Sequence, residues 1–162
     1  MSWRHPRHQR RRDRGAAAVE FALVVPILVL LVGGIIDFGF VFSQQIALNN
    51  SARDAARAGV VTDLAGNGLT CTQIGDRVKT SLQSGAVGLA SGSVVPTVER
   101  LDSGGSPVGS ACSAGGNKPC TGSTVGQQLR VVATYPSKPP FPLPYMNPIN
   151  LTGQGVFQCE YS

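Results

Sequence analysis

Histidine and charge of either sign are scarce in this 162-residue chain. Charged residues make up 14% of it, against about 25% in an ordinary soluble domain. Both histidines, His5 and His8, lie near the N-terminus, so the rest of the chain has no imidazole for a Ser/His/Asp arrangement. The acids of the C-terminal part are scattered, and no glycine run is followed by the Lys-Ser/Thr of a phosphate-binding loop. We therefore expect no enzymatic activity and no cofactor.

The net charge of +5 is confined to the first 14 residues. They hold six arginines and one acid, Asp13, whereas basic and acidic residues balance in the remainder. Because the body of the chain is neutral, it has no basic face for a nucleic acid to bind. No nucleic-acid partner is expected.

A long run without charge follows this basic arm. No charged residue occurs between Glu20 and Asp37. A helix over Ala16–Ile36 is long enough to cross a bilayer core of about 30 Å. The arginines before it favour a cytoplasmic N-terminus and an exported C-terminal part, by the positive-inside rule. The sequence thus predicts a single-pass membrane protein, with its membrane-spanning segment at about 16–42 and membrane lipid as one partner.

A buried core helix and a secretory signal peptide are the alternatives for the apolar run, and both are weaker. A buried core helix would need further apolar helices to surround it, and the sequence offers none. A secretory signal peptide would need small residues at a cleavage site after the run, where Asp37-Phe38 and further aromatic residues occur instead.

The helical pattern continues beyond the apolar run. Leu48, Ala52, Ala55 and Gly59 recur at spacings of four, three and four residues, which predicts one long helix over 16–61. This stripe of small residues would let a partner helix approach closely. Pro26 removes one backbone hydrogen bond, so a bend is expected there.

Glu20 lies inside the apolar span, where a carboxylate without a partner costs about 2–3 kcal/mol. Arg14, six residues earlier, is poorly placed on a helix to pair with it. One interpretation leaves Glu20 solvated at headgroup depth. The other is cleavage after Gly15, which makes Ala16 a new amino terminus whose ammonium can pair with Glu20 of a neighbouring subunit and fix the axial register.

The same residues carry a resemblance to a known family. The chain reads RGAAAVEFALVVPIL at 14–28, GIIDFG at 34–39 and ALNNSARDAARAG at 47–59. In these segments it resembles the TadE-like minor pilins, or pseudopilins, of tight-adherence (Flp-type) pilus systems. The resemblance implies cleavage by a prepilin peptidase after Gly15, with Ala16 as the first mature residue and Glu20 as the assembly glutamate. Phe21 follows Glu20 where the major Flp-type pilins usually carry Tyr, and it is expected to act with Glu20 in assembly and register.

The resemblance also implies partners and a location. The partners are other pilin and pseudopilin subunits, a secretion ATPase and polytopic platform proteins of the membrane. The expected function is that of a minor pilin in pilus assembly, in the inner membrane or in the extracellular pilus. The alternative is an uncleaved, single-pass surface protein whose exported domain binds a ligand or partner.

All four cysteines lie in the Gly-, Ser- and Pro-rich remainder, residues 62–162. An even number of cysteines on the exported side predicts disulfides. Three pairings are possible, and we prefer Cys112–Cys120, which closes a short loop, with Cys71–Cys159. A zinc site is disfavoured because there is no CxxC pair and no nearby histidine, so no metal is expected.

The exported part is predicted to be a small α+β domain, with a second helix and a short antiparallel sheet behind the long N-terminal helix. The helix is expected over Thr72–Gly85, and the strands over Ser93–Leu101, Gln127–Tyr135 and Leu151–Tyr161. Six prolines within Pro136–Pro148 exclude a helix or central strand there and predict an extended loop. The aromatic residues of that loop either dock on their own sheet or form a contact patch.

Overall fold

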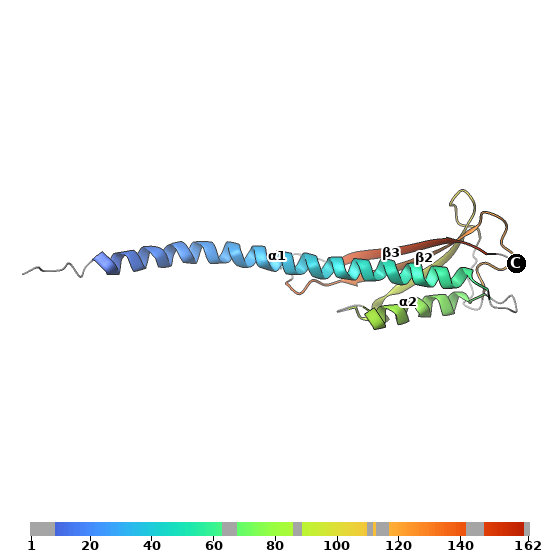
Figure 1. The fold of residues 1–162 in the computed structure, drawn as a ribbon, viewed down its shortest axis with the longest axis horizontal. Helices are drawn as coiled ribbons and strands as arrows, with labels where there is room; N and C mark the ends of the chain where they lie inside the picture. Colours follow the sequence, from blue (N-terminus) through green and yellow to red (C-terminus); the bar gives the residue numbers. More distant parts are fainter. Residues whose placement is uncertain are drawn as a thin grey trace, which may run out of the picture. The chain divides into compact units, whose positions relative to one another are not determined.

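The computed structural model describes residues 9–62, 68–85, 89–109, 112, 117–141 and 148–160. These residues form two helices, a short 3₁₀ turn and three strands (Figure 1). The elements in chain order are α1 (Gln9–Val60), α2 (Cys71–Gly85), η1 (Ser91–Ser93), β1 (Val95–Leu101), β2 (Gln128–Ser137) and β3 (Ile149–Gln158). The predicted α+β class is therefore confirmed.

The chain divides into two compact units, Met1–Gly39 and Phe40–Ser162. The first consists of the N-terminal part of α1, which begins at Gln9, seven residues before the predicted start. The second, which we call the head, contains the C-terminal part of α1 together with α2 and the sheet. The helix is continuous past Pro26, and the bend expected there stays a prediction.

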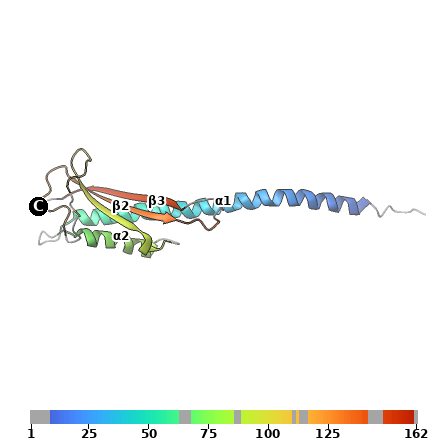
Figure 2. The same cartoon turned by 180° about the vertical axis from the view of Figure 1, so that it is seen from behind.

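The sheet of the head is antiparallel, with the strand order β1-β2-β3. Residues Leu129, Val131, Ala133 and Tyr135 alternate along β2 as buried side chains of one face. Helices α1 and α2 cover that face, and neither of these two described helices lies over the other face (Figures 1 and 2). Helix α2 lies over β1, since a Cβ atom added at Gly75 would come within 3.2 Å of Pro96 Cγ.

Glycines let α1 lie directly against the sheet. A Cβ atom at Gly153 would lie 2.4 Å from the backbone carbon of Leu48, and one at Gly155 would lie 2.6 Å from the carbonyl oxygen of Ala52. On the helix side, a Cβ at Gly59 would lie 2.6 Å from Leu129 Cδ2. Side chains at Gly153 and Gly155 would meet the backbone of α1 and force the layers apart, so glycine is a packing requirement there, whereas at Gly59 the flexible side chains of Leu129 and Ile74 could shift.

This packing identifies the partners of the small-residue stripe on α1. Leu48, Ala52 and Ala55 are fully buried within the head, and Gly59 lies against β2 and α2. The sequence pattern predicts that a partner helix can approach this stripe closely. The chain's own second helix and its sheet occupy the stripe, because small side chains admit a flat sheet surface as well as a helix.

Amide side chains fasten α1 to the ends and edge of the sheet. Ser137 Oγ donates to Gln44 Oε1 at 2.6 Å, and both side chains are buried. Gln45 Nε2 donates to the carbonyl oxygen of Thr152 at 2.8 Å, and the amide of Gln154 donates to Asn49 Oδ1 at 3.3 Å. Since β3 is an edge strand, these two bonds satisfy backbone groups that would otherwise be open to another strand.

The prediction that Pro136 excludes a central strand is wrong. Strand β2 is the central strand and continues through Pro136 to Ser137, paired with Asn150 and Ile149 of β3. Pairing with β1 has already ended at Val95 and Thr134, so the missing N–H of Pro136 breaks no bond on that side. In the same loop, residues 142–147 lie outside the described part.

Both disulfides are present, but the preferred pairing is wrong. The bonds join Cys71 to Cys112 and Cys120 to Cys159, with Cα atoms 5.7 and 5.5 Å apart. The amide of Cys159 donates to the carbonyl oxygen of Gln127, so the end of β3 lies beside the segment that carries Cys120. A short loop favours a bridge only through chain entropy, whereas here the strand pairing decides which sulfurs meet.

Candidate functional site

The residues expected to function lie on the N-terminal part of α1, which presents apolar side chains all round. The large apolar side chains of this segment are exposed along its length, for example by 63% at Val19, 70% at Phe21 and 46% at Ile36. The segment is a candidate membrane span by length and composition, with a mean hydropathy of 2.7 in its most apolar window and none of that window buried. Because apolar surface of this extent is unfavourable in water, this unit needs lipid or other apolar helices around it.

Glu20 is exposed on this apolar surface. Within the described part of the chain it makes no hydrogen bond or ion pair, so any partner for its carboxylate comes from elsewhere. Ala16 precedes it by four residues on the same helix, or about 6 Å along the axis. An amino terminus at Ala16 would therefore place an ammonium one helical turn from this carboxylate.

Gly15 and Pro26, the other two positions singled out in the sequence, are also exposed. A Cβ atom added at Gly15 would have no atom within 4 Å, so packing within the chain does not require a glycine there. The peptide bond between Gly15 and Ala16 lies inside α1. The cleavage at this bond and the assembly role of Phe21 stay predictions.

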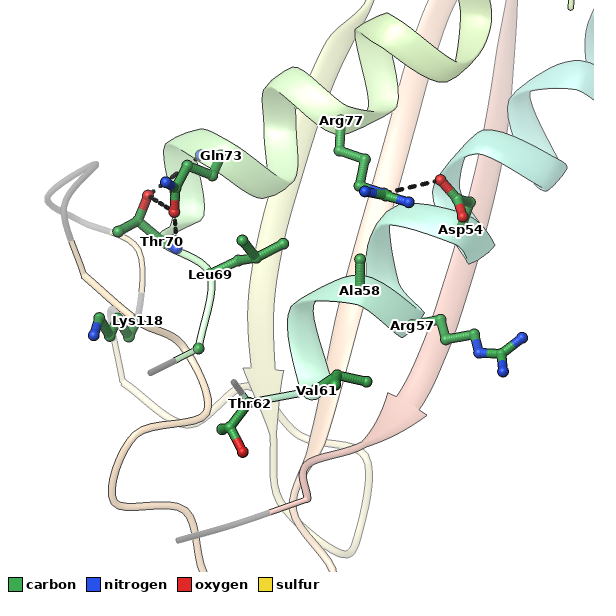
Figure 3. Close-up of a pocket in the computed structure, with 11 residues that line it drawn as sticks. Asp54, Arg57, Ala58, Val61, Thr62, Leu69, Thr70, Gln73, Arg77 and Lys118 are labelled. Carbon is green, nitrogen blue, oxygen red and sulfur yellow. Dashed lines mark hydrogen bonds and ion pairs between the residues drawn. The ribbon is translucent and has the colours of Figure 1, made fainter. Parts of the chain in front are cut away.

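A cluster of charged groups lies in the head, around a groove of about 850 Å³ (Figure 3). Arg77 of α2 donates through Nε to Asp54 Oδ2 of α1 at 3.1 Å, and Ser81 Oγ donates to the same oxygen at 3.0 Å. Burial alone would raise the pKa of Asp54, yet the hydrogen bonds from Arg77 and Ser81, with the positive charges of Arg77 and Arg57, lower it below its usual value. The carboxylate is thus held ionised and joins the two helices.

The first turn of α2 forms another wall of this groove. The amide of Thr70 donates to Gln73 Oε1 at 2.9 Å, and the amide of Gln73 donates to Thr70 Oγ1 at 3.3 Å. This reciprocal pair is a capping box, which fixes where the helix begins. The groove therefore combines a helix cap with an ion pair that is about half exposed, and neither offers a nucleophile next to a base.

The described residues offer no evident metal ligands. No group of three or more His, Cys, Asp or Glu side chains lies together among them. All four cysteines are oxidised in disulfides, so no thiolate is available as a ligand.

The sequence pattern did not identify several residues whose side chains hold the elements of the head together. Gln44, Gln45 and Asn49 fasten α1 to the sheet, and Asp54 joins α1 to α2. The capping box had a readable signal, since Thr70 and Gln73 have the S/T-x-x-E/Q spacing just before a helical pattern. The bond between Gln44 and Ser137 spans 93 residues and leaves no local signal.

Comparison with known proteins gives one match. Residues 15–57 match the model of a family described as TadE-like protein, which confirms the resemblance stated from the sequence. The match covers the exposed apolar part of α1 and most of its buried part. No curated protein and no solved structure matches the chain significantly.

Proposed function

We propose that this chain, TadE-like over residues 15–57, is a minor pilin associated with a tight-adherence pilus. Its apolar helix anchors the precursor in the inner membrane, with the arginine-rich arm in the cytoplasm and the head exported. A prepilin peptidase removes residues 1–15, and the mature chain enters an assembly of pilin and pseudopilin helices. Its work is structural and involves no catalysis.

The observation that carries this proposal is the bare apolar surface of the N-terminal unit, with one carboxylate on it. Large apolar side chains from Val19 to Ile36 are exposed, as is Glu20. In a bundle of like helices the apolar side chains pack on one another, and the new ammonium of Ala16 pairs with Glu20 of a neighbour. A register that brings the ammonium of each subunit to Glu20 of its neighbour pairs these charges between subunits, so the pair favours one axial offset.

The experiment that tests the pairing is a Glu20→Ala substitution in the full chain, expressed in its host. Breaking a buried ion pair costs about 3 kcal/mol or more, so recovery of the chain in sheared pili or in cross-linked assembly complexes should fall about a hundredfold. Glu160→Ala is the matched control, because Glu160 is an exposed acid at the far end of the head. Recovery of the Glu20→Ala variant at the level of the Glu160→Ala variant would contradict the proposed pairing.

The groove beside Asp54 favours a second candidate function, an uncleaved membrane-anchored protein whose head binds a ligand. The two candidates differ at Gly15, which only the pilin must lose. A Gly15→Val substitution should block assembly of a pilin while leaving a surface receptor unchanged. Gly34→Ala is the control, since both glycines have open space around them.

A further inference from the structure

One end of the head combines exposed apolar side chains from both of its layers. Phe42 and Ile46 of α1 are 56% and 46% exposed, and Phe141, just after β2, is 55% exposed. Ile149, the first residue of β3, is 38% exposed and pairs with Ser137, the last residue of β2. Together with Lys138 we call these residues the collar.

A hydrogen bond places the two layers of the collar at the same end of the head. Ser137, at the end of β2, is bonded to Gln44 of α1 at 2.6 Å. Phe42 precedes Gln44 by two residues, and Phe141 follows Ser137 by four. Figures 1 and 2 show the end of β2 and the start of β3 beside this part of α1.

Charge is almost absent from this end of the head. Residues 40–47, 137–141 and 148–151 contain one charged residue, Lys138, which is exposed. The opposite end carries acids and bases together, among them Asp54, Arg57 and Glu160. Exposed Phe and Ile side chains beside a lysine are typical of surfaces that lie at the boundary between headgroups and acyl chains, where the apolar side chains enter the lipid and the lysine reaches the headgroups.

The collar is also close to the apolar helix along the chain. Phe42 follows Ile36 by six residues, so the two are at most about 21 Å apart in any arrangement of the two units. Each interfacial layer of a bilayer is about 5–8 Å thick. If α1 spans the membrane up to about Ile36, the length of chain between the two residues therefore permits the collar to reach the outer headgroup layer.

We propose that the collar lies in the interfacial layer of the phospholipid bilayer, with Phe42, Phe141 and Ile149 among the upper acyl carbons and Lys138 at the headgroup phosphates. The proposal rests on the membrane anchoring proposed above. Contact between the collar and lipid would fix the orientation of the head on the membrane before assembly, which a single helix does not do. Extraction of the subunit into a pilus would then have to free the collar from lipid.

The test uses tryptophan as a depth reporter in the full chain. The chain's one tryptophan, Trp3, is removed by a Trp3→Phe substitution, and Phe141→Trp places the reporter on the collar. The protein is inserted, one chain per nanodisc, into phosphatidylcholine and phosphatidylglycerol, with or without bromine at acyl carbons 6 and 7. Val125→Trp is the control, because Val125 is 89% exposed and lies just before β2, about 30 Å of strand away from the collar.

The collar predicts about a twofold loss of Phe141→Trp emission in the brominated lipid, with Val125→Trp unchanged. A Lys138→Glu substitution should weaken this quenching in discs with anionic lipid, whereas a control Lys118→Glu should not. Equal emission of Phe141→Trp in both lipids, from chains that have entered the discs, would overturn the collar and leave the pilin assignment intact. The collar would also be overturned if the emission of Phe141→Trp changed only in discs that hold several chains, since a second copy of the chain would then cover this surface. Failure to enter the discs at all would contradict the membrane anchoring itself.

Discussion

The two parts of α1 share one helical backbone and differ in what surrounds their side chains. Leu28 in the N-terminal part is 57% exposed, whereas Leu48 in the C-terminal part is fully buried. A Cβ atom at Gly34 would meet nothing within 4 Å, whereas one at Gly59 would lie 2.6 Å from a leucine of the sheet. The C-terminal part thus finds its partners within the chain, and the N-terminal part needs lipid or other apolar helices around it.

This difference shows that helical periodicity alone does not say which partner a helix has. Both parts are rich in small and apolar residues, and the family match covers both without a break. The distinction comes from the glycines of β3 and the amides of α1, which commit the C-terminal part to its own sheet. Substitutions in the two parts should therefore have opposite consequences for folding and for assembly.

The largest effect on the head alone is expected from its disulfides. Each bridge closes a loop of about 40 residues and should contribute about 4 kcal/mol to the free energy of unfolding of the head. Cys71→Ser with Cys112→Ser removes one bridge, whereas Cys112→Ser with Cys120→Ser removes both. Denaturant unfolding of the full chain in detergent should show about twice the loss for the second pair, and equal losses would contradict the pairing described here.

A smaller effect is expected from truncating one leucine in each part of α1. Leu48→Ala leaves a cavity in the core and should destabilise the head by about 3 kcal/mol. Leu28→Ala should leave the unfolding of the head unchanged and weaken insertion or assembly instead. Equal shifts of the denaturation midpoint of the head by the two substitutions would contradict the conclusion that only the C-terminal part of α1 packs within the head.

Alanine substitutions of glycines make the same comparison by adding a methyl group. Gly153→Ala should cost about 2–3 kcal/mol, because the new Cβ meets the backbone of α1 rather than a movable side chain. Gly34→Ala adds the same methyl group where there is open space, and improved helix propensity is its main effect. Circular dichroism melts of the two variants should separate clearly, and a wild-type melt for Gly153→Ala would show that α1 does not pack closely on β3.

The smallest effect is expected at the ion pair between Asp54 and Arg77. Because both side chains are about half exposed, Asp54→Asn should cost no more than about 1 kcal/mol at pH 7. The pKa of Asp54 is lowered in the folded state, so its stabilising contribution is present above its unfolded pKa of about 3.9 and is lost as the pH falls through the lower folded value. Unfolding of wild type and Asp54→Asn, measured from pH 7 to pH 2, should converge only at the acid end, and a constant difference would contradict this assignment.

Much of the fold could be predicted from the sequence because its signals are local. The starts of α2, β1 and β2 and the ends of α2 and β1 lie within two residues of the predicted positions, since periodicity and turn residues act over short distances. The long helix is recognisable from one uncharged run and one stripe. Its earlier start at Gln9 is not, because the arginines there indicate membrane topology whether or not they are helical.

The long-range features could not be predicted in the same way. The pairing of Cys120 with Cys159 depends on β3 ending beside the start of β2, which no sequence spacing encodes. Pro136 is tolerated because β1 is shorter than β2, and the partner of the α1 stripe depends on glycines about a hundred residues away. The candidate site at Glu20 could be predicted more easily, since one acid in an apolar segment is visible in the sequence whatever surrounds it.

In the proposed function, the apolar helix enters an assembly after the basic arm has been removed. Intact-mass measurement of the chain purified from host membranes, with and without the prepilin peptidase, tests it most directly. With cleavage after Gly15, we predict a mature chain that begins at Ala16 when the peptidase is present and a full-length precursor when it is absent. A chain that keeps residues 1–15 in both strains would contradict the account and would leave the head as a membrane-anchored surface domain.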